Sequence, residues 1–220
     1  MTAERAERRL AAIMAADVAG YSRLMGVDEQ SMLHDFKAHC RELIDPAIAA
    51  HLGRPIKTAG DGLLVEFASV VEAVACALDI QQGMSERNAA VPEPRRMQFR
   101  IGINLGDVIA EGGDIHGDGV NVAARLQALA EPGAICVSRS VRDPVRDKIP
   151  AAFEDMGERR LTDVAQPVRV FRMISSLTAS APSQSTKLDL AARRRTSLRL
   201  AVVGASLLFV GFALLAYLRA

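Results

Sequence analysis

The sequence is poor in cysteine and in net charge, and both shortages limit what the chain can be. Only Cys40, Cys76 and Cys136 occur, an odd number of distant residues without a CxxC pair. This argues against a disulfide framework and a zinc site, and predicts small buried thiols in a reducing compartment. The net charge of +1, from 27 basic and 26 acidic residues, argues against a dedicated nucleic-acid binder.

The charges are unevenly distributed along the chain. Residues 181–220 carry a net charge of +5, which leaves about −4 (1 − 5) for residues 1–180. An uncharged stretch of 19 residues, LAVVGASLLFVGFALLAYL, lies between Arg199 and Arg219. As a helix it would cover about 28 Å, close to the hydrocarbon thickness of a bilayer.

This stretch predicts a single membrane span over 199–219, preceded by a Ser/Pro-rich and basic linker over 175–198. Arginines cluster just before the span, and positive charge favours the cytoplasmic side of a membrane. We therefore expect a single-pass protein of the inner or plasma membrane that contacts lipid through its C-terminal span. Its larger domain, residues 1–174, is expected to be cytoplasmic.

The larger domain alternates between strand and helix patterns. The Gly60-Asp61-Gly62 sequence between two short apolar runs predicts a hairpin turn. The order of the elements predicts an α/β or α+β fold in which helices cover a sheet. Strands are predicted at 10–17, 55–59, 63–67, 97–104, 107–110, 134–137, 153–155 and 168–173, and helices at 28–51, 69–87 and 119–130.

Two carboxylates, Asp17 and Asp61, stand where predicted strands end. A hard cation such as Mg²⁺ takes one or two carboxylates together with substrate phosphates, so this pair is a candidate metal site. The small residues that follow Asp17 have N–H groups that suit phosphate oxygens. Lys57 lies four residues before Asp61, an even offset on a strand. The simpler alternatives are a capping aspartate, a hairpin without a function and a solvated lysine.

The stretch from Asp114 to Arg125 carries a second set of polar residues. Asn121 and Arg125 are i,i+4 neighbours on an otherwise apolar predicted helix. A guanidinium suits a phosphate group, and an amide suits a sugar oxygen. A capped helix that merely carries a polar pair is the alternative.

Four blocks together resemble the class III nucleotidyl cyclase catalytic domain in its bacterial adenylate cyclase form. Their order, spacing and residue types agree with that family over roughly residues 8–174. The resemblance implies a ferredoxin-like α+β domain that forms a head-to-tail homodimer with its active sites at the subunit interface. The blocks are AADVAGYSRLM (15–25), IKTAGDGLLVEF (56–67), FRIGINLGDVI (99–109) and DIHGDGVNVAARL (114–126).

The same resemblance assigns roles by position. Asp17, Asp61 and the Val18 carbonyl would hold two Mg²⁺ or Mn²⁺ ions per site, and residues Gly20, Tyr21 and Ser22 would meet the substrate. The other subunit of the dimer would supply the remaining groups. These are Lys57 and Asp114 to read adenine, Asn121 to position the ribose and Arg125 to stabilise the transition state.

The expected activity is that of an adenylate cyclase in cyclic-nucleotide signalling. The ribose 3′-hydroxyl of ATP would attack the α-phosphorus and release pyrophosphate. One departure stands out, because Thr162 occupies the place of a family lysine that contacts the triphosphate. Weaker ATP binding is expected unless Arg159 or Arg160 substitutes for that lysine. The alternatives are an inactive cyclase-like module that dimerises or senses nucleotide at the membrane, and a guanylate cyclase, which Lys57 and Asp114 disfavour.

Overall fold

The structure, a computed structural model, describes residues 7–174, with the backbone alone described for residues 57–59. Its single sheet holds the strands β1 Glu7–Val18, β2 Arg54–Ala59, β3 Gly62–Phe67, β4 Phe99–Glu111, β5 Asp114–His116, β6 Ile135–Ser138, β7 Ala152–Arg159 and β8 Val168–Ile174. The α-helices are α1 Tyr21–Met25, α2 Glu29–His39, α3 Asp45–Ala50, α4 Val70–Asn88, α5 Asp118–Leu129 and α6 Arg139–Val145. None of the helices described is long and apolar enough to cross a membrane. The predicted linker 175–198 and span 199–219 lie outside the described residues.

In the sheet, β1 lies between β3 and β4. The order is β2-β3-β1-β4-β6-β8-β7, and β5 pairs with β4. β1 runs antiparallel to both β3 and β4, whereas β6 runs parallel to β4. From β1 to β4 the chain follows the βαββαβ connectivity of a ferredoxin-like domain, with α2–α3 and α4 as the crossovers. The predicted α+β arrangement is confirmed.

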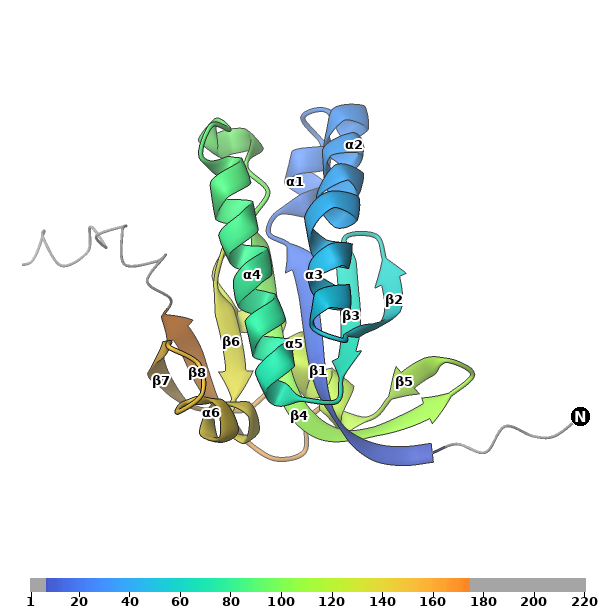
Figure 1. The fold of residues 1–220 in the computed structure, drawn as a ribbon, viewed down its shortest axis with the longest axis vertical. Coiled ribbons are helices and arrows are strands. Elements are labelled where there is room, and N and C mark those ends of the chain that lie inside the picture. The colour runs from blue at the N-terminus through green and yellow to red at the C-terminus, as the bar shows by residue number, and fades with distance from the viewer. Residues whose placement is uncertain (1–6, 175–220) are drawn as a thin grey trace, which may run out of the picture. The chain divides into compact units, whose positions relative to one another are not determined.

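Helices cover the two faces of this sheet unequally (Figure 1). α2, α3 and α4 pack on one face over the main core, which includes Phe99. α5 packs on the other face over a smaller cluster that includes Ile13. Because side chains alternate along a strand, Asp17 of β1 lies on the same face as Ile13. The face that carries α5 is therefore the face that carries the first candidate carboxylate.

The helix predicted over 28–51 is interrupted. Asp28 caps its start as predicted, since its Oδ1 accepts a hydrogen bond of 3.1 Å from the Ser31 N–H. Between α2 and α3, residues Cys40–Ile44 form a π-helical turn in which the Asp45 N–H reaches the Cys40 carbonyl. Pro46 lies two residues after this turn and has no N–H to donate to a carbonyl in the turn before it, which favours the wider turn there.

The strands predicted at 97–104 and 107–110 form one continuous strand, β4. Gly106 is not a break. Gly102 and Gly106 lie under α5, where a Cβ on Gly102 would stand 2.1 Å from the Gln127 backbone nitrogen. The glycines therefore serve close helix–sheet contact, and the chain turns later, at Gly112-Gly113, into the unpredicted strand β5. Both turn glycines have positive φ, as a tight two-residue hairpin requires.

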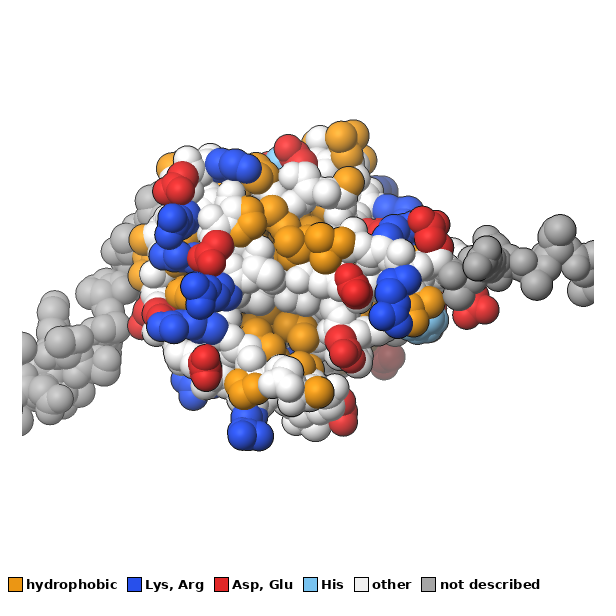
Figure 2. All heavy atoms as spheres, turned by 90° about the horizontal axis from the view of Figure 1, so that it is seen from below, with side chains coloured by type: hydrophobic (Ala, Val, Ile, Leu, Met, Phe, Trp, Pro, Cys, Tyr) orange, Lys and Arg blue, Asp and Glu red, His pale blue; other side chains and the backbone are white. Residues whose placement is uncertain are grey.

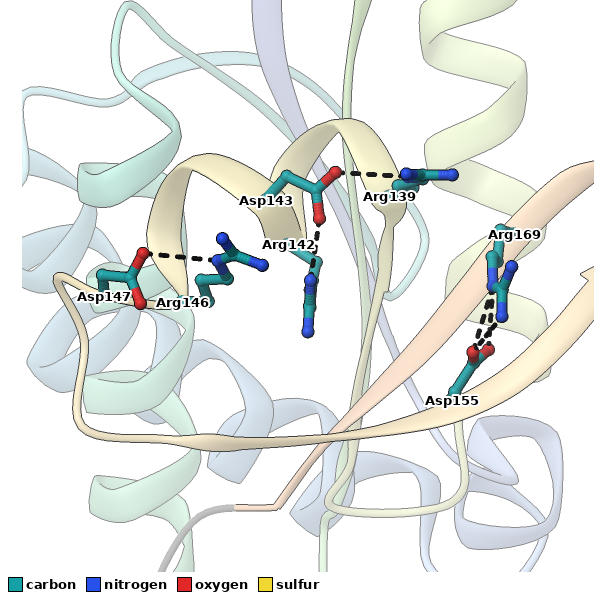
Figure 3. A network of polar contacts seen from close by, with 7 residues as sticks. All are labelled: Arg139, Arg142, Asp143, Arg146, Asp147, Asp155 and Arg169. Atoms are coloured by element: carbon teal, nitrogen blue, oxygen red, sulfur yellow. Dashed lines mark hydrogen bonds and ion pairs between the residues drawn. The ribbon is translucent and has the colours of Figure 1, made fainter.

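Helix α6 was also not predicted, because its sequence RSVRDPV lacks a clear apolar period. Val141 and Val145 are its buried residues. Its arginines pair with neighbouring carboxylates, and Arg142 lies over the Phe171 ring at 5.3 Å. Figure 3 shows the pairs Arg139–Asp143, Arg142–Asp143, Arg146–Asp147 and, between β7 and β8, Arg169–Asp155. Seen from below in Figure 2, basic and acidic side chains are mixed on the left, the side where α6, β7 and β8 lie in Figure 1.

The three cysteines are free, as predicted. Cys76 and Cys136 are buried and Cys40 is half-buried. Burial raises the pKa of the Cys76 thiol to about 12 and that of Cys136 to about 11. These groups are protonated packing residues and not nucleophiles.

His51 clamps the end of α3 to α4 in a way that depends on pH. Its Nδ1 lies 2.8 Å from Glu72 Oε2 and its Nε2 lies 2.9 Å from Asp79 Oδ2. Both partners accept hydrogen bonds, so both ring nitrogens must carry protons to make both bonds. The Asp79 hydrogen bond, and after it that of Glu72, raises the pKa of His51 above its ordinary value.

We expect His51→Gln to cost more stability at pH 6 than at pH 8.5. The pKa is raised in the folded state, so the stabilisation is complete below the ordinary histidine pKa of about 6.5 and is lost as pH rises through the folded value. Since both carboxylates are largely exposed, the difference should be about 1 kcal/mol or less. Urea unfolding of both proteins at the two pH values measures it. An equal cost at both would show that the imidazolium contributes nothing.

Candidate active site

The two candidate metal-binding carboxylates are held next to each other. Asp17 is the penultimate residue of β1, and Asp61 lies in the turn between β2 and β3. The Val18 backbone N–H donates a hydrogen bond of 3.1 Å to Asp61 Oδ2, which ties the hairpin turn to the end of β1. The sequence predicted this pairing from two separate strand ends, and the structure brings Asp17, Val18 and Asp61 together.

Arg100, to which no motif of the sequence assigns a role, completes this cluster. Arg100 lies opposite Asp17 in the β1–β4 register. Its Nε donates to Asp17 Oδ1 at 2.9 Å and its Nη2 to Oδ2 at 2.6 Å, a bidentate pair that is about three-quarters buried on the aspartate side. The Asp17 hydrogen bonds, with the field of Asp61, raise the pKa of Arg100. The signal was the cross-strand register, which cannot be read until β1 and β4 are paired.

The cluster fits a hard divalent cation. Its donors are carboxylate oxygens with a backbone carbonyl beside them, which is the ligand chemistry of Mg²⁺ and Mn²⁺. Arg100 already shows that a cation is favourable against Asp17, and a bound metal would compete with that guanidinium. No group of three or more His, Cys, Asp or Glu side chains that could hold a metal occurs within residues 7–174. The two carboxylates would therefore need further oxygen ligands, such as phosphates.

The turn after β1 leads into the short helix α1, whose N–H groups are the predicted phosphate donors. Gly20 has φ +67° and directly precedes α1. The N–H groups of Arg23 and Leu24 bond to the Gly20 carbonyl, and the Ala19 N–H bonds to the Gln98 carbonyl. The first-turn N–H groups of a helix, here those of residues 20–22, have no partner inside that helix. The Tyr21 ring packs edge-on against Phe36 at 5.9 Å, so its side chain belongs to the core.

A second cluster forms around α5. Val122, Ala123 and Leu126 face the core, whereas Asn121 and Arg125 are exposed. Arg125 is held by the loop between β7 and β8. Its Nε donates to the Thr162 carbonyl at 3.2 Å, and its Nη2 lies 2.7 Å from Asp163 Oδ2. The position where the family lysine is missing is thus adjacent to the predicted transition-state arginine. Arg159 ends β7 and Arg160 follows it, both exposed.

The two predicted base-reading residues lie on strands β2 and β5, which are not paired with each other in the sheet. Lys57 is in β2, opposite Leu64 of β3. Asp114 begins β5, and its Oδ1 accepts a hydrogen bond of 2.8 Å from the Ile115 N–H. Arg54 of β2 donates from Nη1 to the Gly113 carbonyl at 3.2 Å, which joins β2 to the hairpin that carries Asp114.

The candidate residues thus fall into two groups with separate contacts. Asp17, Asp61 and Arg100 contact one another across β1, β4 and the β2–β3 turn. Arg125 contacts the β7–β8 loop instead. Each group presents charged side chains that remain partly exposed. One chain therefore carries two separate groups of candidate residues.

Comparisons with known proteins identify relatives of the chain. The family described as adenylate and guanylate cyclase catalytic domain matches residues 4–173. Putative adenylate cyclase 3 of Rhizobium meliloti (strain 1021) is 44% identical over 171 residues, which cover 78% of this chain and 29% of that protein. The chain spans 19% to 33% of the length of that protein and two other curated relatives.

Solved structures are similar as well. A crystal structure described as adenylate/guanylate cyclase/hydrolase, from Silicibacter pomeroyi, is 50% identical with a TM-score of 0.74 and covers 78% of this chain and 100% of that one. The adenylyl cyclase CyaB from P. aeruginosa is 21% identical with a TM-score of 0.68, and it covers 78% of this chain and 97% of its own. The second likeness concerns the fold alone.

Proposed function

The chain belongs to the adenylate and guanylate cyclase catalytic-domain family, and on that basis we propose that it converts ATP to 3′,5′-cyclic AMP and pyrophosphate. The observation that carries the proposal is the junction of Asp17 and Asp61 through the Val18 N–H at the end of the central strand. This junction gathers oxygen ligands beside backbone N–H groups that suit a triphosphate.

Each half of the site has a distinct chemical task. Asp17, Asp61 and the Val18 carbonyl would hold two Mg²⁺ or Mn²⁺ ions, which lower the pKa of the ribose 3′-hydroxyl and neutralise phosphate charge when bound. Arg100 stands beside them with a fork that matches phosphate oxygens. Arg125 would meet the charge that develops at the α-phosphoryl group, and Asn121 would fix the ribose.

The choice of ATP over GTP rests on Lys57 and Asp114. Adenine presents an acceptor at N1 and a donor at N6, which complement a lysine donor and an aspartate acceptor. Guanine presents the opposite pattern at these positions. A site built for one set of donors and acceptors rejects the other because buried polar groups would be left unpaired.

A second copy of the chain would complete the site. The metal-binding half and the half around Arg125 have separate contacts within one chain, and Arg125 is exposed. A head-to-tail homodimer would bring the Asp17 half of one subunit against the Arg125 half of the other. Such a twofold arrangement would give two equivalent sites per dimer.

One observation favours a second candidate function. Thr162 lacks a cationic side chain, and Asp163 pairs with Arg125 at 2.7 Å. A chain in which the transition-state arginine is already occupied could serve as an inactive dimerising or nucleotide-sensing module. An assay for cyclic nucleotide products distinguishes this inactive module from a catalyst.

The full chain in detergent, supplied with Mg²⁺ or Mn²⁺ and either ATP or GTP, tests the proposal. Chromatography of the products should show cyclic AMP and pyrophosphate from ATP, and much less cyclic GMP from GTP. Preference for GTP would overturn the adenine assignment. Nucleotide binding without any cyclic product, at concentrations where the chain is dimeric, would favour the inactive module.

Thr162→Lys is expected to lower the KM for ATP about tenfold while changing kcat less. The new ammonium would stand beside Arg125, where a charge-assisted hydrogen bond to phosphate contributes about 1.5 kcal/mol. Gln166→Lys, in the same exposed loop, is the matched control for added charge. Steady-state kinetics of both variants decide the matter. An unchanged KM in Thr162→Lys would show that position 162 does not touch phosphate.

We propose a membrane location on the basis of the sequence alone. The uncharged residues 200–218 suit a bilayer, and the basic residues before them favour a cytoplasmic domain. Protease treatment of oriented vesicles measures this, with digestion of residues 1–174 expected only from the cytoplasmic side. Protection of that domain in inside-out vesicles would refute the assignment.

A further inference from the structure

A buried carboxylate with two arginine partners joins strands β1, β2 and β3. Glu66 of β3 is 7% exposed and is the one buried charged residue among the residues that the structure describes. Arg9 of β1 grips it through Nε to Oε1 and Nη2 to Oε2, both at 2.9 Å. Arg54 of β2, directly opposite Glu66 in the register, donates to Oε2 from Nε at 3.0 Å and also from Nη2. Both carboxylate oxygens therefore accept hydrogen bonds from arginine, as a buried charge requires.

The two arginines differ in what else they reach. Arg9 has a second acidic neighbour at the start of its own strand, Glu7 at 3.9 Å. Arg54 instead uses its third donor nitrogen, Nη1, to bond to the Gly113 carbonyl at 3.2 Å. Because a guanidinium is planar and rigid, Glu66 fixes the orientation in which Arg54 meets that carbonyl. Arg54 thus links the edge strand β2 to the tip of the β4–β5 hairpin.

This link stands between the two segments that carry the base-reading candidates. Gly113 is the residue before Asp114, and Arg54 lies three residues before Lys57. A bulge between Pro55 and Lys57 shifts the register, so Arg54 lies opposite Glu66 and Lys57 opposite Leu64, two residues along the same strand. β5 is three residues long and is joined to β4 by a turn of two glycines with positive φ.

We propose that Arg54, oriented by the buried Glu66, is a positioning residue that sets the spacing between Lys57 and Asp114 and thereby the choice between ATP and GTP. The inference rests on the proposed function. A donor and an acceptor distinguish adenine from guanine only when their separation matches N1 and N6. Displacements of about 1 Å in such a site can cost about 10²-fold in rate. Arg54 touches neither nucleotide nor metal in this scheme and acts through Gly113.

The cluster supplies its own matched control. Arg54→Gln removes the link to Gly113 but leaves Arg9 to neutralise Glu66, so the fold should survive. Arg9→Gln removes an equivalent pair of hydrogen bonds to Glu66 and leaves the link intact. Arg54→Lys keeps the charge near Glu66, but a single ammonium lacks the fork that reaches both Glu66 and Gly113.

The measurement is the ratio of kcat/KM for ATP to that for GTP in the full chain, with the thermal midpoint of unfolding recorded alongside. Arg54→Gln and Arg54→Lys are each expected to lower the ratio about tenfold. Arg9→Gln should keep the ratio within about twofold of wild type, even if its thermal midpoint falls as far as that of the Arg54 variants. The ratio of the Kd values of fluorescent ATP and GTP analogues is measured as well, because it reports base selection in binding without turnover.

The outcomes separate cleanly. An unchanged ratio in both Arg54 variants, or an equal fall in Arg9→Gln, would overturn the positioning role and leave the cyclase proposal standing. A wild-type chain that produces no cyclic nucleotide would refute the proposed activity. In that case the Kd ratios still decide whether Arg54 governs base selection, and Arg54→Lys replaces Arg54→Gln if the latter does not fold.

Discussion

Asp17→Asn is expected to lower cyclic nucleotide formation about 10²- to 10³-fold, with little change in fold. The substitution preserves the shape of the side chain but removes the charge that a divalent cation requires. It also removes the anionic partner that holds Arg100 through two hydrogen bonds. The kcat/KM for ATP with Mg²⁺ measures the effect, and the thermal midpoint of unfolding reports on the fold.

Asp155→Asn is the control for this prediction. Asp155 also accepts two hydrogen bonds from one arginine, from Arg169 Nε at 3.0 Å and Nη2 at 2.6 Å. This pair joins β7 and β8 and not β1 and β4 (Figure 3). Its pair is more exposed than that of Asp17. Full activity in Asp155→Asn together with a large loss in Asp17→Asn would assign the loss to the site. Retention of more than about a tenth of the activity by Asp17→Asn would contradict its role as a metal ligand.

Arg125→Ala is expected to be as inactive as Asp17→Asn when each is assayed alone, yet a mixture of the two should regain activity. In a mixed dimer, one site would combine both substitutions and the other would combine neither. Equal amounts that exchange subunits freely should therefore reach about a quarter of the wild-type rate. The assay is cyclic AMP formation after co-incubation, with each variant alone at the same total concentration.

The rescue distinguishes two models of the site. If both groups acted within one chain, every site in the mixture would contain one substitution and no activity would return. Size-exclusion chromatography of the mixture verifies that dimers form. Absence of rescue in dimeric protein would refute the assignment of Asp17 and Arg125 to opposite subunits.

The positions of Asp17 and Asp61 at strand ends could be predicted from the sequence because local patterns determine them. Asp17 ends an apolar run, and Asp61 stands in a Gly-Asp-Gly hairpin, so each position follows from its own neighbours. Arg100 escaped notice for the opposite reason. It meets Asp17 only through the pairing of β1 with β4, two strands 83 residues apart in sequence at this contact.

Other differences have equally specific causes. Residues 105 and 106 fell outside the two predicted strands because a glycine weakens a strand pattern, and only the packing of α5 shows why glycine stands there. α6 has Val141 and Val145 as its buried contacts and depends on charge pairs for the rest. The contact of Arg125 with Asp163 links α5 to a loop 38 residues later, which no periodicity reports.

The glycines of β4 and its hairpin also imply different freedoms for change during evolution. A side chain at Gly102 would collide with the backbone of α5, at 2.1 Å from the Gln127 nitrogen and 2.3 Å from the Ala123 carbonyl. No rotamer adjustment relieves a backbone collision, so the helix that carries Asn121 and Arg125 would have to rise as a whole. At Gly112 a Cβ meets nothing within 4 Å, and only its positive φ resists substitution. Substitutions should therefore be tolerated more readily at the hairpin tip than at position 102, where only glycine fits.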